Sequence, residues 1–257
     1  MNGWLEAQGR RWPLVYRHLF VHRLELEPNE AIEQLLARRS NQGTLVLNPP
    51  APHVEMKSTL ARLSEVLDQP EWAAAIGLTA REIDVVADHV PWTRWLSDPG
   101  PDRTLATHRW LHEVLDTPES FVLKRSWSYG GRDVFFGRHA RDPDKFEPAR
   151  RLFPGVRDWR DLCGRAASDR QGGGFVVQRV VPVTRSAITF ATPDQLRTVQ
   201  ATTDFSMFAS FGVAASWTGV CRAAASDIVN IAGGGGVVPL LRQSVADEVA
   251  SLRNDPA

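Results

Sequence analysis

The segment FVLKRSWSYGGRDV, from Phe121 to Val134, has the pattern of a strand, a glycine-containing turn and a second strand. Gly130 and Gly131 leave backbone N–H groups unshielded, and Ser128 offers a hydroxyl beside them. Lys124 stands inside the first apolar run, where it can place a compact positive charge beneath the turn. The segment therefore predicts either a hairpin that folds over a polyphosphate or an ordinary hairpin with a long turn.

Three common catalytic or nucleotide-binding motifs do not occur in the sequence. There is no Gly-Lys-Ser/Thr of a Walker loop, and no G-x-G-x-x-G opens a helix after a predicted strand. A G-x-S-x-G nucleophile elbow is missing as well. The sequence thus disfavours the P-loop and dinucleotide-binding folds and gives no support to a serine hydrolase.

A second glycine-rich stretch follows a strand predicted over residues 228–231, which carries Asn230. Four glycines come next, at Gly233, Gly234, Gly235 and Gly236. Consecutive residues without a side chain are costly to order and leave their N–H groups accessible, which suits an anionic ligand. The alternative interpretation is a flexible surface loop.

Composition limits the class of protein. The 257 residues are 43% hydrophobic, enough for a sizeable core, and 30 basic residues balance 30 acidic ones. This balance argues against a nucleic-acid partner. No segment approaches the length of a membrane span, and no charged start leads into an apolar run, so we expect a cytoplasmic protein without a membrane partner.

Few residues have the spacing of metal ligands. His108 and His112 are four apart on a predicted helix, but no third ligand is near them, so we expect a surface or packing role. Cys163 and Cys221 lack neighbours at metal-ligand spacing, and we interpret both as buried thiols.

Periodicity predicts a helix-rich first half and a strand-rich second half. Helices are predicted over residues 30–39, 60–67, 105–115 and 240–252, and one begins at a capping box of Thr79 and Glu82. Residues 14–26 are predicted to be a strand or a strand followed by a turn. Further strands are predicted over residues 44–47, 121–124, 133–136, 175–181, 199–208, 217–223 and 228–231. Residues 141–169 show helical spacing only in places.

Five short motifs occur together in a fixed order. They are Asn48-Pro49-Pro50 with Lys57, Val122-Leu123-Lys124 with Gly130-Gly131, Val176-Val177-Gln178, Asp204-Phe205-Ser206, and Val229-Asn230 with Gly233 to Gly236. In this order the chain resembles the ATP-grasp fold, in particular the circularly permuted ATP-grasp proteins related to glutathionylspermidine synthase. The resemblance runs from about Val15 to Leu241. It implies an α+β fold of two subdomains with ATP between antiparallel sheets.

The resemblance assigns the ATP site to the first group of motifs. Lys57 and Lys124 are implied to contact the phosphates, and Ser128, Gly130 and Gly131 to form a mobile lid. A linking strand is implied to offer backbone groups to adenine. That strand contributes Gln178, Arg179 and Val180.

The later motifs are implied to serve metal binding and transfer. Asp204 and Asn230 would ligate Mg²⁺, and Arg222 would steady the transferred phosphoryl group. The glycines from Gly233 to Gly236 would form the acceptor loop. The implied cofactors are ATP and Mg²⁺, and the implied reaction is carboxylate–amine ligation of small molecules through an acyl phosphate.

One departure from the family pattern favours a second interpretation. Ile228 stands two residues before Asn230, where family members often carry an acid that strand alternation places on the same face. The alternative is therefore a nucleotide-binding pseudoenzyme or partner subunit without its own turnover. A third hypothesis is a phosphotransferase that uses the same ATP site without forming an amide.

The resemblance also predicts the domains. Residues 1–50 are expected to be the remnant of a pre-ATP-grasp domain, and residues 51–257 the ATP-grasp region. Within that region we expect a helical part over 51–118 and the ATP-binding sheets over 119–257. Family members usually carry a complete N-terminal domain, so a partner protein that supplies one is a further expectation.

Overall fold

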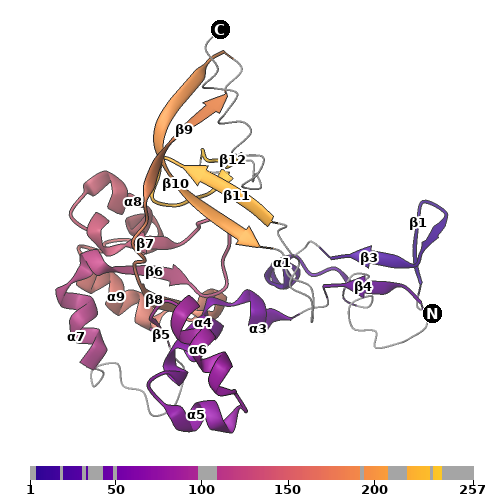
Figure 1. Cartoon of the computed structure of the whole chain (residues 1–257), viewed down its shortest axis with the longest axis horizontal. Helices are drawn as coiled ribbons and strands as arrows, with labels where there is room; N and C mark the ends of the chain where they lie inside the picture. The colour runs from indigo at the N-terminus through magenta and orange to yellow at the C-terminus, as the bar shows by residue number, and fades with distance from the viewer. Residues whose placement is uncertain are drawn as a thin grey trace, which may run out of the picture. The chain divides into compact units, whose positions relative to one another are not determined.

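The computed structural model describes residues 4–17, 20–30, 33, 43–48, 51–97, 109–191, 194–207, 219–231 and 234–238. The chain divides into two compact units, Met1–Val180 and Val181–Ala257. Both contain antiparallel sheets and the first is rich in helices, so the predicted α+β class is confirmed (Figure 1). The domain boundary predicted at residue 50 stays a prediction.

The first unit is built on a four-stranded antiparallel sheet. Its strands are β5 (Thr93–Trp95), β6 (Phe121–Arg125), β7 (Val134–Phe136) and β8 (Phe175–Arg179). They lie in the order β5-β8-β6-β7. On β6, Lys124 is opposite Val176 of β8 on one side and Val134 of β7 on the other.

One face of this sheet carries the hydrophobic core. Alternate residues of β6 and β8, Phe121 and Leu123 with Phe175 and Val177, point into it because successive side chains of a strand point to opposite faces. Three helices cover that face: α7 (Arg109–Asp116), α8 (Pro143–Leu152) and α9 (Trp159–Ser168). Burial of each large apolar side chain stabilises the fold by roughly 1.5–3 kcal/mol.

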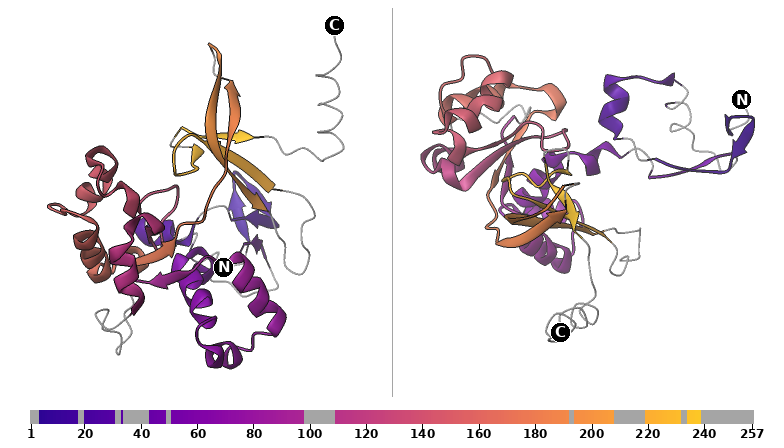
Figure 2. Two further views of the ribbon diagram at one scale, coloured as in Figure 1. Left: turned by 60° about the vertical axis from the view of Figure 1, so that its left-hand side comes forward. Right: turned by 90° about the horizontal axis from the view of Figure 1, so that it is seen from above.

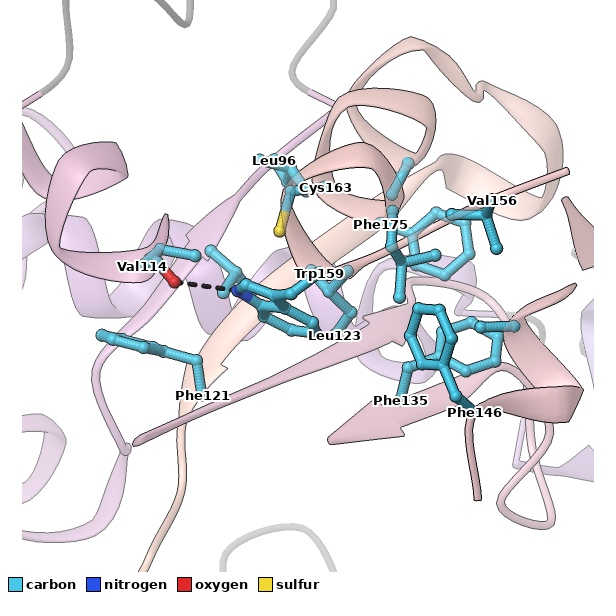
Figure 3. Packing of buried hydrophobic residues seen from close by; sticks show 14 residues of the cluster. Leu96, Val114, Phe121, Leu123, Phe135, Phe146, Val156, Trp159, Cys163 and Phe175 are labelled. Atoms are coloured by element: carbon cyan, nitrogen blue, oxygen red, sulfur yellow. Dashed lines mark hydrogen bonds between the residues drawn. The ribbon is translucent and has the colours of Figure 1, made fainter. Parts of the chain in front are cut away.

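Figure 3 shows how side chains from these elements meet in the core. The indole Nε1 of Trp159 donates a hydrogen bond of 2.8 Å to the carbonyl oxygen of Val114, which joins α9 to α7. Phe135, Phe146 and Phe175 group at one end of the cluster. The α8 and α9 helices are complete, and Asp142 and Asp158 cap their first turns.

Further helices of this unit belong to the segment that precedes β5. They are α3 (Pro52–Glu55), α4 (Lys57–Val66), α5 (Pro70–Ala75) and α6 (Ala80–His89). The hydroxyl of Ser64 on α4 accepts the backbone N–H of Thr93 at 3.0 Å, which joins α4 to β5. The capping box predicted for Thr79 and Glu82 is confirmed at the start of α6. Short 3₁₀ turns complete the unit at Pro118–Ser120, Gly137–His139 and Gln171–Gly173.

The first residues of the chain form small separate elements. These are the hairpin of β1 (Leu5–Ala7) and β2 (Arg10–Trp12), the parallel pair of β3 (Leu14–Tyr16) and β4 (Leu45–Leu47), and α1 (Val21–Leu26). The strand predicted from residue 14 is confirmed over Leu14–Tyr16, and a strand or turn over 21–26 is wrong because these residues form α1. A carboxylate oxygen of Glu55 accepts the Val21 N–H at 2.8 Å, which favours a helix start there.

The second unit is a four-stranded antiparallel sheet, drawn in orange and yellow in Figure 2. Its strands are β9 (Arg185–Ala191), β10 (Leu196–Met207), β11 (Gly219–Ala224) and β12 (Gly236–Val238), in the order β12-β11-β10-β9. The strand predicted over 228–231 is wrong. Those residues form an irregular turn, which the hydrogen bond from Gly235 N–H to the Asn230 carbonyl closes at 3.0 Å.

The other predicted elements are confirmed to within a few residues where the structure describes them. The predicted strands 44–47, 121–124, 133–136, 175–181, 199–208 and 217–223 correspond to β4, β6, β7, β8, β10 and β11. The helix at 60–67 is α4, and the described part of the helix at 105–115 is α7. The helix at 240–252 and, apart from residues 30 and 33, the helix at 30–39 lie outside the described residues. Within the described ranges, no helix has the length and apolar character to cross a membrane.

Core packing predicts a large contrast between two leucines. Leu162 on α9 is fully buried, whereas Leu60 on α4 is 38% exposed. We expect Leu162→Ala to lower the free energy of unfolding by about 2–5 kcal/mol because it removes apolar contacts and leaves a cavity. Leu60→Ala, the matched control, should cost less than half as much. Denaturant unfolding followed by circular dichroism measures both, and equal losses would contradict the assigned core.

Candidate functional site

The start of α4 is fastened to the end of β6. The backbone N–H of Lys57 donates to the carbonyl oxygen of Ser126 at 2.9 Å, and that of Ser58 donates to the Ser126 hydroxyl at 3.0 Å. Two of the N–H groups that a helix start leaves without partners are thus satisfied by one serine. Lys57 is the first residue of α4, three residues before the start predicted for this helix.

Lys124 is held on the opposite face of the sheet from the core. Its ammonium donates to Oε1 of Gln178 at 2.5 Å, and Nε2 of Gln178 donates to the Thr93 hydroxyl at 2.9 Å. A chain of polar side chains therefore crosses β6, β8 and β5. It orients Gln178 and leaves the remaining donors of the Lys124 ammonium for a ligand.

The two lysines, far apart in the sequence, are brought within electrostatic range. Burial, and next the charge of Lys124, lower the pKa of Lys57 from 10.5 to about 8, while Asp133 opposes this shift. Burial also lowers the pKa of Lys124. Within the described residues, neither ammonium forms an ion pair with a carboxylate. Two partly buried cations that have no carboxylate of the described residues in direct contact form a site that favours an anion.

The predicted glycine turn lies against this pair. The Lys57 ammonium donates to the carbonyl oxygen of Ser128 at 2.5 Å. Gly130 and Gly131 have φ angles of +65° and +75°, a region that favours glycine. The turn closes where Arg125 binds Asp133, with 2.6 Å between Nε and Oδ2. Lys57, Lys124 and the turn thus form one local arrangement, and their predicted contact with phosphates stays a prediction.

The remaining residues of the predicted adenine strand are engaged within the first unit. Gln178 is buried. The Arg179 guanidinium pairs with Glu113 at 2.6 Å, and the N–H of Val180 donates to the Ser120 carbonyl at 2.8 Å. Their predicted contact with adenine stays a prediction.

In the second unit, the predicted metal ligand and the predicted catalytic arginine are partners. Asp204 on β10 lies directly opposite Arg222 on β11. Nε of Arg222 donates to Oδ1 of Asp204 at 2.9 Å, and Nη2 donates to Oδ2. This bidentate pairing raises the pKa of Arg222. A carboxylate held in this way must share or exchange its partner to bind Mg²⁺.

The glycine run is explained in part by the packing of the second sheet. A Cβ added to Gly235 would lie 2.7 Å from the Ala223 carbonyl oxygen, and one added to Gly236 would lie 2.9 Å from the Phe190 ring. Gly234 has a φ of +93°. Gly233 lies outside the described residues, and the acceptor role of the run stays a prediction.

The loop that carries Asn230 differs from its expected form. Because residues 228–231 are not a strand, alternation does not place Ile228 and Asn230 on one face. The neighbouring Asp227 pairs with Arg185 at 3.2 Å. The expectation that Ile228 occupies the position of a metal ligand beside Asn230 is therefore wrong.

The two cysteines and the histidine pair can also be placed. Cys163 is buried as predicted, and burial raises the pKa of its thiol, whereas Cys221 is only half-buried. His108 lies outside the described residues. Across the part of the chain that the structure describes, no three histidine, cysteine or acidic side chains gather as metal ligands.

Sequence reasoning did not single out Thr93 or Asp133, which support Gln178 and the glycine turn. Thr93 carries no motif, and its role arises only because β5 pairs with β8. Asp133 directly follows the glycine turn, so its position next to Gly-Gly-Arg was the available signal.

The lysine pair predicts an unusual titration. The chain contains three lysines, at positions 57, 124 and 145, so ¹³Cε labelling of lysine gives three signals. We expect the Lys57 signal to titrate with a pKa of about 8. Since this folded-state pKa lies below the unfolded value, charged Lys57 destabilises the fold below about pH 8. That penalty is relieved as the pH rises towards 10.5.

Lys57→Arg identifies the signal by deleting it, and Lys145→Arg does the same for a lysine outside the site. A Lys57 signal that titrates near 10.5 would show that the ammonium is not held in the environment described above.

Comparison with known proteins adds no family to this description. No family model matches the chain, and no curated protein is significantly similar to it.

Proposed function

We propose that the chain is a cytoplasmic ATP-grasp protein that binds ATP with Mg²⁺ and acts as a carboxylate–amine ligase. The observation that carries this proposal is that the ammonium groups of Lys57 and Lys124 lie within electrostatic range of each other beside the Gly130-Gly131 turn. Two cations that lack a carboxylate counter-ion, under a turn able to cover a ligand, suit a polyphosphate better than a monoanion. The ordered set of five sequence motifs supports the same conclusion.

The chemistry of such an enzyme would use few protein groups. A carboxylate oxygen of the acceptor attacks the γ-phosphorus of ATP, and the bond to the β–γ bridging oxygen breaks to release ADP. The nitrogen of an amine would then attack the acyl carbon, the acyl carbon–oxygen bond to phosphate would break, and the nitrogen would lose one proton, which leaves an amide and inorganic phosphate. The lysine ammonium groups would neutralise charge on the phosphate oxygens throughout the transfer.

The second unit would supply the remaining groups. Asp204 and the side-chain oxygen of Asn230 are the hard oxygen donors that suit Mg²⁺, which supplies charge neutralisation at the phosphates. Arg222 would bind the transferred phosphoryl group. In the free protein the ion pair of Asp204 with Arg222 keeps both side chains ordered at neighbouring positions of the sheet.

A pseudoenzyme or partner subunit that binds nucleotide without turnover is the second candidate. The same ion pair favours it, because the Asp204 carboxylate already has a cation as partner. The loop position of Asn230 favours it too, since the resemblance places this residue on a strand and residues 228–231 do not form one. A partner protein would then complete the catalytic site.

Loss of one lysine charge tests nucleotide binding. We expect Lys124→Met to weaken binding of a non-hydrolysable ATP analogue by at least about tenfold, since one charge-assisted hydrogen bond is lost. Removal of the partly buried charge offsets the loss of the donor to Oε1 of Gln178, and circular dichroism of the variant checks that it folds. Lys145→Met is the matched control, because that side chain is 59% exposed and lies outside the site. Calorimetric titration with and without Mg²⁺ measures the affinity, and equal affinity of Lys124→Met and wild type would remove the proposal.

Substitution at the second unit separates the ligase from the pseudoenzyme. Asp204→Asn should abolish ADP release in the presence of carboxylates and amines, because the neutral amide is a poor Mg²⁺ ligand. Binding of the ATP analogue without Mg²⁺ should stay within about threefold of wild type. Asp194→Asn, at an exposed position of the same unit, should leave both unchanged. Undiminished ADP release by Asp204→Asn would exclude the assigned role, and a wild type without turnover would favour the pseudoenzyme.

A further inference from the structure

A cavity of about 760 Å³ opens within the first unit beside the lysine pair. Its walls come from α1, from the β6–β7 turn and from the segment around Gly172 and Gly173. Its volume lies in the range that small-molecule sites occupy, roughly 300–1,000 Å³. Among its lining residues, only Ser128 was assigned a role by the resemblance, as part of the lid.

The charge of the cavity wall is positive. Arg125, Arg132 and Arg170 line it together with a single carboxylate, that of Asp133. Arg125 is compensated, because it pairs with Asp133 at 2.6 Å and with Asp169 at 3.1 Å.

The other two arginines have no carboxylate partner within the described part of the chain. The Arg132 guanidinium lies over the Tyr129 ring at 5.4 Å, and Arg170 donates to backbone carbonyls, including that of Ala167 at 3.0 Å. Two cations are thus left to attract an anion into the cavity.

The wall is also aromatic and apolar. Trp127 and Tyr129 line it from the turn, and Leu26, Met56 and Leu152 add aliphatic surface. His22 of α1 packs against Trp127, with 5.0 Å between ring centroids. The ligand that fits such a wall has an apolar or aromatic body as well as a negative charge.

Two buried ring nitrogens in this wall lack partners. Nδ1 of His22 and Nε1 of Trp127 are shielded from solvent and have no hydrogen-bond partner among the described residues. The indole N–H is a donor only, and a buried donor without an acceptor costs roughly 1–3 kcal/mol. Because both atoms are shielded, a ligand oxygen in the cavity could bond to them only after the two rings shift.

The cavity adjoins the proposed phosphate site. Ser128 lines the cavity, and its carbonyl oxygen accepts the hydrogen bond from the Lys57 ammonium. Met56, which also lines it, directly precedes Lys57. One short turn therefore contacts both the cavity and the lysine pair.

We propose that this cavity binds an organic carboxylate with an aromatic or branched apolar body. Arg132 and Arg170 attract the carboxylate, and Trp127 and Tyr129 contact the body. Its further role as the acceptor that is phosphorylated rests on the proposed function, whereas binding of the acid does not. The site thereby names the substrate class of the ligase.

Fluorine NMR of the intact chain tests binding directly. The nine tryptophans are replaced by 5-fluorotryptophan, and Trp127→Phe identifies the Trp127 signal by deleting it. The probe is 3-phenylpropionate, titrated without nucleotide. We expect a saturable shift of the Trp127 signal and a much smaller one with 3-phenylpropionamide, which has the same shape without the charge. No saturable shift up to the solubility limit, or equal shifts with both compounds, would overturn the proposal.

Two variants locate the charge. Arg132→Gln, at an exposed side chain, should weaken binding of 3-phenylpropionate by about tenfold through loss of a charge-assisted contact. Arg141→Gln, an exposed arginine outside the cavity, is the matched control and should leave the affinity unchanged. Equal affinity of Arg132→Gln and wild type would also overturn the proposal.

Calorimetric titration of the same sample with the ATP analogue distinguishes the two proposals. If the acid binds and the ATP analogue does not, the proposed cavity site is supported and the proposed ligase is excluded. If the ATP analogue binds and the acid does not, the proposed nucleotide site is supported and binding of an acid in the cavity is excluded.

Discussion

The junction between α4 and β6 is the contact on which the candidate site depends. Ser126 is fully buried and accepts the backbone N–H groups of both Lys57 and Ser58, through its carbonyl and its hydroxyl. Its own N–H donates to the Gly174 carbonyl at 2.7 Å. A helix start, a strand end and a glycine segment therefore converge on one small residue. These hydrogen bonds hold the start of α4 against the end of β6, and they thereby place Lys57 near Lys124.

The pairing of the two lysines is unfavourable in itself, because burial and like charge both oppose the ammonium forms. The fold tolerates it by fixing each ammonium on a neutral oxygen, that of the Ser128 carbonyl for Lys57 and that of the Gln178 amide for Lys124. A carboxylate paired with each lysine would lower this free-energy cost. A bound anion can do the same for Lys57 and Lys124. Such uncompensated charge is typical of functional sites.

The sequence anticipated the α+β class and most of the elements that carry the site, since periodicity and capping are local properties. It failed where contacts distant in sequence decide the conformation. Val21 begins a helix because Glu55 accepts its N–H, and residues 228–231 turn because Gly235 bonds to Asn230. The cavity beside the lysines could not be anticipated, because its walls from α1 and from the segment of Arg170 are distant in sequence from the β6–β7 turn.

Composition and motif order by themselves determined that Lys57, Lys124 and the Gly130-Gly131 turn were candidates for binding a phosphate. A lysine inside an apolar strand and two glycines in a turn are visible without coordinates. Only the tertiary structure decided which of these groups meet, which are neutralised and which remain charged. The physical reason is that charge compensation depends on distances of a few ångströms between segments. In the first unit, packing of α4 on β6 fixes those distances.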